Sequence, residues 1–508
     1  MKNNEMSVLQ ARGPLVVEAA GDLALLREAL KQAGFTAPAV AQTLGIRSPG
    51  EGVDLPVVLR RIEAPTEYNT LLRLFFLGQS VTEASAVRAL KPMPVPTLLK
   101  VGLLRASRRG VHSIGRLAPF EDLYCLSDFT GPEASKPPRP AHVLGVNPAS
   151  VILANLTVRR RRETVFDLGA GCGIQSLLAS QHAARVIGSD LNLRALNFAA
   201  FNARLNGLGN LEWRAGSYFA PVHGEQFDLV VANPPFAISP ESCLLYRDGG
   251  LPGDGVSEQV VQGAAACLKE GGYASVLLNW HHATDTDWHE RPWAWLADSG
   301  CDGWLIRFAD QDPLTYAAAW LVQSHHQNPH RYGRLLDQWL KYYADLGIRR
   351  IGIGQLTLRR RQAQTNWFRC DTLPEIQGGC PCGDQIQRIF AAEDFLNGLQ
   401  KDEEFMAQRL AISPDVVLDQ RLAPRDAGWV VEAINLRLAR GLPFAGNVDA
   451  ALLRLVNTCD GKRPLRDLIA AMVEGSGQNA QTVRQQCLEM ARNLVRWGML
   501  VPRGPMET

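Results

Sequence analysis

Between residues 141 and 280, short apolar runs alternate with stretches in which apolar residues recur every three to four positions. The runs predict strands at Thr164–Leu168, Arg185–Asp190, Leu211–Ala215, Phe227–Ala232 and Tyr273–Leu278. The stretches between them predict helices at Gln175–Ala184, Leu193–Leu205 and Gly255–Leu268. Strands that alternate with helices in this way pair in parallel, with helices on both faces. The expected fold class is therefore α/β, with a parallel Rossmann-like sheet.

The residues on either side of this region show helical patterns instead. The first part of the chain predicts helices around Leu23–Phe35, Tyr68–Leu77 and Thr82–Leu90. A short segment, Arg105–Phe120, then turns at Gly110, and short helices followed by a small hairpin are typical of a winged helix. Residues from 441 to about 503 again predict short helices, and these end in Arg-Trp-Gly-Met-Leu-Val at 496–501, which is similar to Lys-Val-Gly-Leu-Leu at residues 100–104.

These patterns divide the chain into five parts. We expect a helical, winged-helix-like domain at 1–125, a linker at 126–140, a ligand-binding α/β domain at 141–370, a helical connector at 371–440 and a second winged-helix-like domain at 441–508. Pro137, Pro138 and Pro140 favour the linker, because proline interrupts both helices and sheets.

Composition limits the classes of protein to which the chain can belong. Its 508 residues exceed a single hydrophobic core, so about two to four domains are expected. The hydrophobic fraction of 46% is ordinary for a globular protein. The net charge of +2 implies no global attraction to nucleic acid or to a membrane. No apolar run reaches the roughly 18 residues of a membrane span, and Met1–Gly21 has no secretory pattern. The cysteines are scattered, so we expect mostly buried thiols and a cytoplasmic location.

Val165–Gly173, with the sequence Val-Phe-Asp-Leu-Gly-Ala-Gly-Cys-Gly, is the strongest chemical signal. A predicted strand ends in a glycine-rich turn, where the backbone can approach a ligand closely, and the amides at the start of the next helix favour polar groups. A dinucleotide dehydrogenase uses a similar turn, and Asp190, at the end of the second strand, suits the ribose of either cofactor. Asp167 separates the two, since its carboxylate would repel a pyrophosphate and suits a cationic ligand.

This sequence resembles the class I S-adenosylmethionine-dependent methyltransferases over roughly residues 141–280. Val165–Gly173 is similar to the first motif of that family, Ser189-Asp190 to the second and Ala215–Tyr218 to the third. The resemblance implies a seven-stranded sheet and S-adenosylmethionine as cofactor. The cofactor-binding residues that it implies are Asp167, Gly169, Ala170, Gly171, Gly173, Asp190, Leu191, Gly216, Ser217 and Asn233. Ser217 departs from the family, which often has Asp at this position.

The predicted strand Phe227–Ala232 runs directly into the tetrad Asn233-Pro234-Pro235-Phe236. Two prolines stiffen this loop at the carboxyl edge of the sheet, where ligands bind. The side-chain oxygen of Asn233 and the backbone carbonyl of Pro234 are each able to accept one N–H bond from an NH2 group, which aims the nitrogen lone pair at a methyl donor. Phe236 is able to stack on a planar group. These four residues are therefore the predicted catalytic residues of a nitrogen methylase.

The tetrad resembles two groups of enzymes, and the substrate stays open between them. The HemK-type release-factor glutamine methyltransferases share an acidic, glycine-rich segment that is similar to Tyr246–Gly250 and Gly253–Gly255. Among the amino-group methylases of adenine or guanine, the ribosomal-RNA guanine group commonly has Phe where Phe236 stands, but the His that often follows there is Ala237 here. The resemblance thus implies a macromolecular partner, either a protein such as a release factor or ribosomal RNA. A binding module that keeps the cofactor fold without catalysis is a third hypothesis.

Several other features have both a functional and a structural interpretation. Arginines gather at Arg159–Arg162 and between Arg349 and Arg369, where they would bind RNA phosphates or face solvent. Trp280 follows a predicted strand and borders either the substrate or the core. Asn147–Ser150 either covers the cofactor or caps a helix. Cys370, Cys380 and Cys382 lack the spacing of a zinc site, so no metal is expected.

Overall fold

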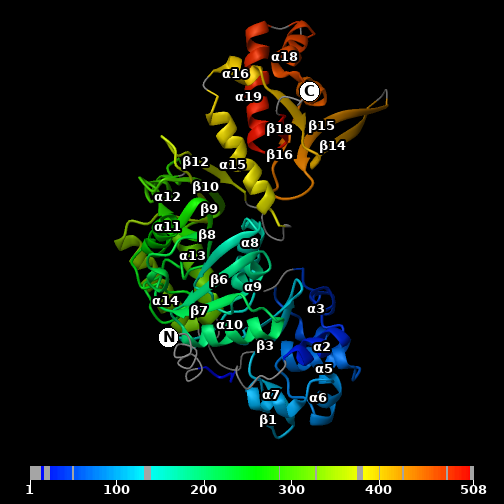
Figure 1. Ribbon diagram of the computed structural model, residues 1–508, viewed down its shortest axis with the longest axis vertical. Coiled ribbons are helices and arrows are strands. Elements are labelled where there is room, and N and C mark those ends of the chain that lie inside the picture. Colours follow the sequence, from blue (N-terminus) through cyan, green and yellow to red (C-terminus); the bar gives the residue numbers. More distant parts are fainter. Residues whose placement is uncertain are drawn as a thin grey trace. The chain divides into compact units, whose positions relative to one another are not determined.

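The structure is a computed structural model that describes residues 13–16, 23–47, 51–130, 139–284, 286–325, 329–373, 381–399, 401–425, 428–475, 477 and 479–503. The chain forms two compact units, Met1–Gly378 and Gly379–Thr508 (Figure 1). The boundary lies eight residues after the expected end of the α/β domain at residue 370.

A mixed sheet is the centre of the first unit. Its strands are β5 (Arg162–Leu168), β6 (Ala183–Asp190), β7 (Leu211–Ala215), β8 (Phe227–Ala232), β9 (Leu268–His282), β10 (Cys301–Gln311), β11 (Arg350–Arg360) and β12 (Phe368–Thr372). Their order is β12-β10-β11-β9-β8-β5-β6-β7, and β11 alone runs antiparallel to its neighbours. The α/β class and the five predicted strands are confirmed. The sheet has eight strands among the described residues rather than seven, because β12 pairs with the outer edge of β10.

Two hydrophobic cores lie on opposite faces of this sheet. The helices that pack against this sheet include α8 (Pro148–Leu156), α9 (Ile174–Ser180), α10 (Leu193–Asn206), α11 (Gly255–Ala266) and α12 (Glu290–Ala294). Phe166 and Val230 pack with α11 in one core. Leu177 and Phe198, from α9 and α10, belong to the other. The predicted helices on both faces are thus confirmed.

The amino-terminal part of the chain shares the core of α9 and α10. Its elements are α2 (Ala24–Gln32), α3 (Ala37–Leu44), α4 (Leu55–Arg61), α5 (Glu67–Leu71), a π-helix (Leu72–Phe76), α6 (Glu83–Leu90), α7 (Val95–Val101), β1 (Leu104–Ser107), β2 (Gly110–Ser113), β3 (Arg116–Phe120) and β4 (Leu123–Ser127). The predicted helices and the turn before Gly110 are present. Leu26, Phe75 and Leu126 pack in one core with Phe198 and Phe201. The structure therefore makes residues 1–125 part of the first unit, and the winged-helix assignment stays a prediction.

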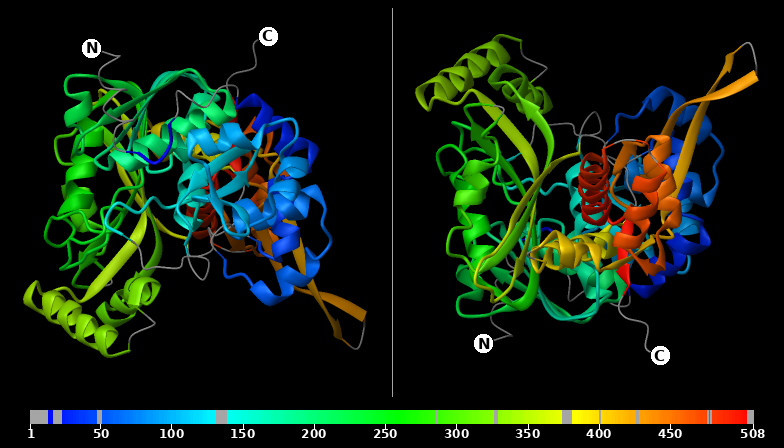
Figure 2. Two further views of the ribbon diagram at one scale, coloured as in Figure 1. Left: turned by 90° about the horizontal axis from the view of Figure 1, so that it is seen from below. Right: turned by 90° about the horizontal axis from the view of Figure 1, so that it is seen from above.

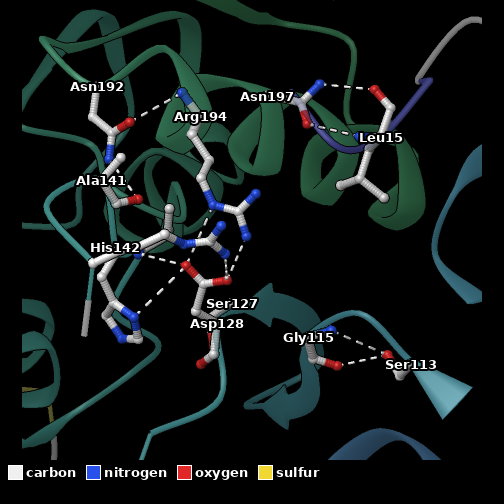
Figure 3. Close-up of polar contacts among 12 residues, drawn as sticks. Leu15, Ser113, Gly115, Ser127, Asp128, Ala141, His142, Asn192, Arg194 and Asn197 are labelled. Atoms are coloured by element: carbon white, nitrogen blue, oxygen red, sulfur yellow. Dashed lines mark hydrogen bonds and ion pairs between the residues drawn. The ribbon is translucent and has the colours of Figure 1, made fainter. Parts of the chain in front are cut away.

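Asparagines on α10 hold the backbone of this amino-terminal part. The Asn197 amide binds both the N–H and the carbonyl of Leu15, at 3.2 and 2.9 Å (Figure 3). Asn202 binds the N–H and the carbonyl of Leu126 in the same way, at 2.8 and 3.0 Å. Asn206 does so with Tyr124. Each amide replaces the hydrogen bonds that a neighbouring strand would supply.

A helical hairpin that the sequence did not predict lies between β10 and β11. It consists of α13 (Pro313–His325) and α14 (Pro329–Asp345). Tyr316, Trp339 and Tyr343 are buried in a separate core there together with Ile238, which lies two residues after the tetrad. Within the sheet, β10 points in the same direction as β8 and β9. The hairpin follows the end of β10, so it lies at the carboxyl edge, next to the tetrad loop.

The second unit is partly β, which corrects the expected helical connector at 371–440. It contains α15 (Gly383–Asn397), α16 (Asp402–Met406), β13 (Arg409–Ile412), β14 (Val416–Arg425), β15 (Gly428–Leu438), β16 (Ala445–Asn447), α17 (Ala450–Thr458), β17 (Asp460–Pro464), α18 (Leu465–Glu474), α19 (Ala480–Arg496) and β18 (Leu500–Arg503). The strands β14 and β15 form a long hairpin that extends from the helices of this unit (Figure 2). The charged residues of these strands led to the helical prediction. In the structure they form ion pairs across the two strands, such as Arg437 with Asp419.

The helices expected within 441–508 are present as α17, α18 and α19, with β17 and β18 between and after them. The sheet of these strands is completed by β13, which lies outside the predicted domain boundary. A second winged-helix-like domain stays a prediction.

Most of the described cysteines are buried, as expected, but Cys243 is exposed because it lies in a surface loop. Cys380 and the prolines at 137 and 138 lie outside the described residues. No group of three potential metal ligands occurs among the residues that the structure describes. None of the helices in that part of the chain combines the length and apolarity that crossing a membrane requires.

Candidate active site at the carboxyl edge of the sheet

The glycine turn after β5 leaves an open space above the sheet. Gly169, Gly171 and Gly173 have positive φ angles of 72°, 57° and 86°. A Cβ on Gly173 would lie 2.9 Å from the Cβ of Ala199, so this glycine allows close helix packing. At Gly169 and Gly171 a Cβ would meet nothing closer than 3.9 Å. These two glycines therefore border a space that a ligand is able to fill, while Ala170 between them is buried.

Asp190 ends β6 and faces this turn. Its carboxylate accepts the Gly171 N–H at 2.9 Å and the Asn192 N–H at 2.7 Å. Burial raises the pKa of Asp190, against the backbone N–H bonds, which lower it. The next residue, Leu191, is 61% exposed, an unusual position for a large apolar side chain. An acid beside an exposed apolar side chain suits a ribose joined to a planar base.

Asp167 lies beneath the turn rather than at its surface. Its carboxylate is 1% exposed and accepts the N–H of Ser176 at 2.9 Å and its hydroxyl at 2.6 Å. Burial raises the pKa of Asp167 to about 7, the bonds from Ser176 oppose this, and the charge of Asp190 adds to it. Asp167 thus fixes the first turn of α9, and a direct contact with a cationic ligand stays a prediction.

The third predicted motif follows β7 and leads into a short 3-10 helix, Ala220–Val222. The N–H of Gly216 donates to the Asp190 carbonyl at 3.1 Å, which joins this loop to the previous one. Ser217 is exposed. Tyr218 adopts a φ of 48° and its hydroxyl donates to the carbonyl of Gly249 at 3.2 Å. The loops after β5, β6 and β7 therefore meet at one edge, as predicted for parallel strands.

The tetrad lies beside the glycine turn. A Cβ on Gly169 would be 3.9 Å from the carbonyl oxygen of Asn233, which places the two loops in contact range. Asn233 is half-buried, and no residue within the described part of the chain hydrogen-bonds its side-chain amide. The carbonyl of Pro234 accepts the Phe236 N–H at 2.8 Å, with Pro235 between them. One polar side chain is therefore left open in a loop with a fixed backbone.

The glycine-rich segment that resembles the HemK type packs against this loop. Phe236 and Asp248 form a β-bridge, and the Ala237 N–H donates to the Arg247 carbonyl at 3.3 Å. A Cβ on Gly249 would lie 2.9 Å from the Pro235 carbonyl, so glycine is required for the approach. Arg247 and Asp248 form a buried ion pair at 2.7 Å. The acidic residue of the segment thus supports the loop rather than facing solvent.

The α13–α14 hairpin supports the other side of the loop. The Ile238 N–H donates to the Tyr316 hydroxyl at 3.0 Å, and the Tyr343 hydroxyl donates to the Ile238 carbonyl at 2.8 Å. The ring of Trp320 meets the edge of Phe236 at 6.4 Å between centroids. The sequence analysis missed these contacts. The signal that could have shown them is a pair of aromatic residues spaced by four positions, Tyr316 with Trp320 and Trp339 with Tyr343.

The chain before β5 connects three parts of the site. Asp128, just after β4, binds Arg194 of α10, the N–H of Val143 and the side chain of Arg139, and His142 lies 3.8 Å from it (Figure 3). The Ala141 carbonyl accepts the Asn192 side-chain N–H at 3.2 Å. Asn147 is the N-cap of α8 and binds the Ser150 N–H at 3.0 Å, so the capping interpretation of this segment is confirmed.

Two other candidates have structural roles. Trp280 is fully buried in β9, which continues to His282, and its ring packs on Gly352 of the neighbouring strand. Four arginines of the second cluster pair with acids. Arg359 and Arg361 pair with Asp302 and Arg350 with Asp310, both acids of β10, and Arg369 pairs with Asp371 on its own strand. Arg159 pairs with Glu121 at 3.3 Å. These side chains neutralise acids within the fold, which reduces the charge available for RNA.

The model of the methyltransferase small domain family matches residues 145–287. Two families of domains of unknown function match residues 32–114 and 387–502. A release factor glutamine methyltransferase from Xylella fastidiosa strain Temecula1 is 31% identical over 131 residues, which are 23% of this chain and 46% of that protein. A ribosomal protein uL3 glutamine methyltransferase from Bradyrhizobium diazoefficiens is 30% identical over 30% of this chain and 51% of its own length. This chain spans about half the length of these relatives.

A further relative, from Methanocaldococcus jannaschii, is provisionally named a protein N5-glutamine methyltransferase. It is 30% identical over 25% of this chain and 68% of its own length. Three features define a class I S-adenosylmethionine-dependent methyltransferase fold: the order of the strands, the glycine turn after β5, and Asp190 at the end of β6. With these matches, the chain belongs to the methyltransferase small domain family of that class.

Proposed function

We propose that this protein is an S-adenosylmethionine-dependent methyltransferase that methylates the side-chain amide nitrogen of a glutamine in a protein substrate. The observation that carries the proposal is the Asn233–Phe236 loop, whose backbone is held on both sides and whose Asn233 amide is left without a partner among the described residues. The names of the three relatives, all glutamine methyltransferases, support this substrate class. A release factor or ribosomal protein as substrate agrees with the expected cytoplasmic location.

The residues at the edge of the sheet fit S-adenosylmethionine. Gly169 and Gly171 leave room for a ligand where a Cβ would meet no close neighbour. Asp190 would hold the ribose hydroxyls, and Leu191, which is exposed beside it, would cover the adenine. Gly216 and Ser217 lie next to Asp190, because the Gly216 N–H donates to the Asp190 carbonyl. When bound, the cofactor supplies a methyl group on a positively charged sulfur.

Within the chain, catalysis consists of positioning the acceptor. An amide nitrogen is a weak nucleophile because its lone pair is delocalised. The side-chain oxygen of Asn233 accepts one of its N–H groups, the second lone pair of the Pro234 carbonyl accepts the other, and Phe236 stacks on the planar group. This turns the nitrogen lone pair toward the methyl donor. No strong base is required, because the leaving thioether is neutral and the proton departs afterwards.

An exocyclic amino group of adenine or guanine in RNA is the second candidate acceptor, since it offers the same planar NH2 group. The Phe at position 236 favours it. The ion pairs of the second arginine cluster count against it, because arginines that neutralise Asp302, Asp310 and Asp371 have less capacity to bind phosphates. A binding module without catalysis has no use for an intact Asn233–Phe236 tetrad, which counts against that third hypothesis.

The test is transfer of labelled methyl from S-adenosylmethionine to a fractionated lysate, followed by digestion. We expect protease to release the label and ribonuclease to leave it in place. The Asn233→Ala chain is the control, and it should transfer no label above background. Label released by ribonuclease would instead establish the nucleic-acid acceptor.

A further inference from the structure

Asn279, on β9, has a buried polar atom that lacks a partner. The residue is 1% exposed, and its side-chain oxygen Oδ1 accepts no hydrogen bond from the described residues. Its Nδ2 donates to the hydroxyl of Tyr316 at 2.6 Å. A buried amide oxygen without a donor costs free energy in the absence of a ligand, so its presence beside a candidate site calls for a functional explanation.

The sheet register places Asn279 at the acceptor side of the site. Val276 is the partner of Ala232, the last residue of β8, so Asn279 lies three residues further toward the carboxyl edge. Asn233 begins its loop at the same edge. Residues that are register partners on neighbouring strands share a face of the sheet. Ser275 is the partner of Val231, and Val231 is the partner of Asp167, so these three share one face. Asn279, four residues after Ser275, points to that same face.

Tyr316 holds the Asn279 amide in position relative to the tetrad. Its hydroxyl accepts both the Asn279 Nδ2–H and the N–H of Ile238, two residues after Phe236. Tyr316 is fully buried, and Trp320, one turn further along α13, contacts Phe236. The free oxygen of Asn279 is thus tied through one hydroxyl group to the loop that carries Asn233.

We propose that Asn279 is a further acceptor-binding residue. Asn233 accepts one N–H of the planar acceptor, and the Asn279 Oδ1 shares the other N–H with the Pro234 carbonyl. This inference rests on the proposed function. The Pro234 carbonyl already accepts the Phe236 N–H, so the loop alone offers the NH2 group one free side-chain oxygen and one shared carbonyl. Asn279 supplies another oxygen that is fixed before the substrate binds, and binding then removes its unpaired state. Tyr316 acts as the positioning residue.

The test compares Asn279→Leu with wild type, using the lysate fraction that wild type labels. Leucine has a similar size and removes the unpartnered oxygen. We expect kcat to fall about 10- to 100-fold, because one positioned contact to the acceptor is lost, while the affinity for S-adenosylmethionine is kept. The Tm should stay close to that of wild type, because removal of the unpartnered oxygen offsets loss of the Nδ2 bond to Tyr316, whose hydroxyl still accepts the Ile238 N–H. A structural role would lower Tm and kcat together.

Two further variants separate a direct contact from support of the loop. Tyr316→Phe leaves the Ile238 N–H without an acceptor, so its Tm should fall, and its loss of kcat should be smaller than that of Asn279→Leu. Gln385→Leu, in the second unit, is the matched control, since Gln385 is also buried and its Nε2 lacks a partner among the described residues. Its kcat should equal that of wild type.

The inference is overturned if Asn279→Leu keeps kcat within twofold of wild type. It is equally overturned if Asn279→Leu and Tyr316→Phe lose the same activity with the same fall in Tm, because Asn279 would then only support the loop. Failure of the proposed function is a different result: wild type deposits its label in RNA, and the Asn279 comparison is then made on that acceptor. A wild-type chain that transfers no label at all overturns both.

Discussion

The asparagines of α10 and those at the carboxyl edge of the sheet use the same side chain in opposite ways. On α10, Asn197 and Asn202 are buried and bind a backbone N–H and a carbonyl with each amide. At the edge, the side chain of Asn233 has no partner among the described residues, and Asn279 has one polar atom without a donor. Amides with both atoms paired join two parts of the fold, whereas an amide with a free oxygen remains available to a ligand.

This difference predicts what each substitution should change. Removing a paired amide leaves buried backbone groups unbonded and lowers the free energy of unfolding. Removing an unpaired amide leaves stability unchanged and lowers turnover. In the sequence these four residues are all asparagines, and only hydrogen bonding in the folded chain separates the two kinds.

The largest effect is expected for Asn233→Ala. The variant loses the side-chain oxygen that orients the acceptor NH2 group, and a positioned contact of this kind is worth a factor on the order of 100–1000 in turnover. Cofactor affinity and Tm should stay close to wild type, because no described residue binds the amide. Steady-state kinetics, calorimetry and thermal melting check the three values. A variant that melts early would make Asn233 a structural residue like those of α10.

Asn202→Ala should have the opposite effect. The amide binds the Leu126 N–H, the Leu126 carbonyl and the Cys172 carbonyl, at 2.8, 3.0 and 2.8 Å. Leaving these buried groups unbonded should cost about 2–4 kcal/mol of the free energy of unfolding. Urea denaturation measures the loss. The folded variant should keep the kcat of wild type, and a selective loss of kcat without a change in stability would break the comparison.

Asp190 combines both kinds of behaviour. Its oxygens bind the Gly171 and Asn192 N–H groups and would also accept the ribose hydroxyls of the cofactor. Asp190→Ala should weaken S-adenosylmethionine binding by about 1.5–3 kcal/mol for each charged bond lost. Asp190→Asn keeps one acceptor oxygen and should lose less. Calorimetry that finds unchanged affinity in both variants would remove Asp190 from the ribose site.

The effect expected for Asp167, which Ser176 binds within the fold, is confined to the pH dependence of stability. Its folded pKa of about 7 lies above the unfolded value of about 3.9. The folded chain therefore holds this proton more tightly, and the contribution to stability is full below pH 3.9 or so and is lost as pH rises through about 7. Asp167→Asn should remove this part of the pH dependence. Urea midpoints from pH 4 to 8 check it, and equal slopes for both chains would contradict the assignment.

The sequence was most informative where structure is local. The strands Leu211–Ala215 and Phe227–Ala232 match their predicted ends, because an apolar run bounded by polar turns defines them. The glycine turn and Asp190 meet as predicted, since parallel strands bring their carboxyl ends to one edge. Contacts between distant segments were not predictable. Asn202 meets Leu126, 76 positions away in the chain, and no periodicity indicates such a pair.

One error concerned the length of an element and another its type. The sequence ended β9 at Leu278, which left Trp280 after the strand with both the substrate and the core open to it, but β9 continues to His282 and Trp280 enters the core. Strand alternation then turns its neighbour Asn279 to the opposite face, so the candidate residue was missed by one position. The charged strands β14 and β15 were predicted as helical, because their ion pairs form across the hairpin rather than along a helix.

The central claim is that the chain methylates a glutamine amide through Asn233. The most direct measurement is acid hydrolysis of the protein fraction that wild type labels, because cleavage of a methylated side-chain amide releases volatile labelled methylamine. We expect most of the label as methylamine, and none above background from a reaction with Asn233→Ala. Label that is recovered on a nucleotide base, or methylamine that the Asn233→Ala chain produces at the rate of wild type, would contradict the claim.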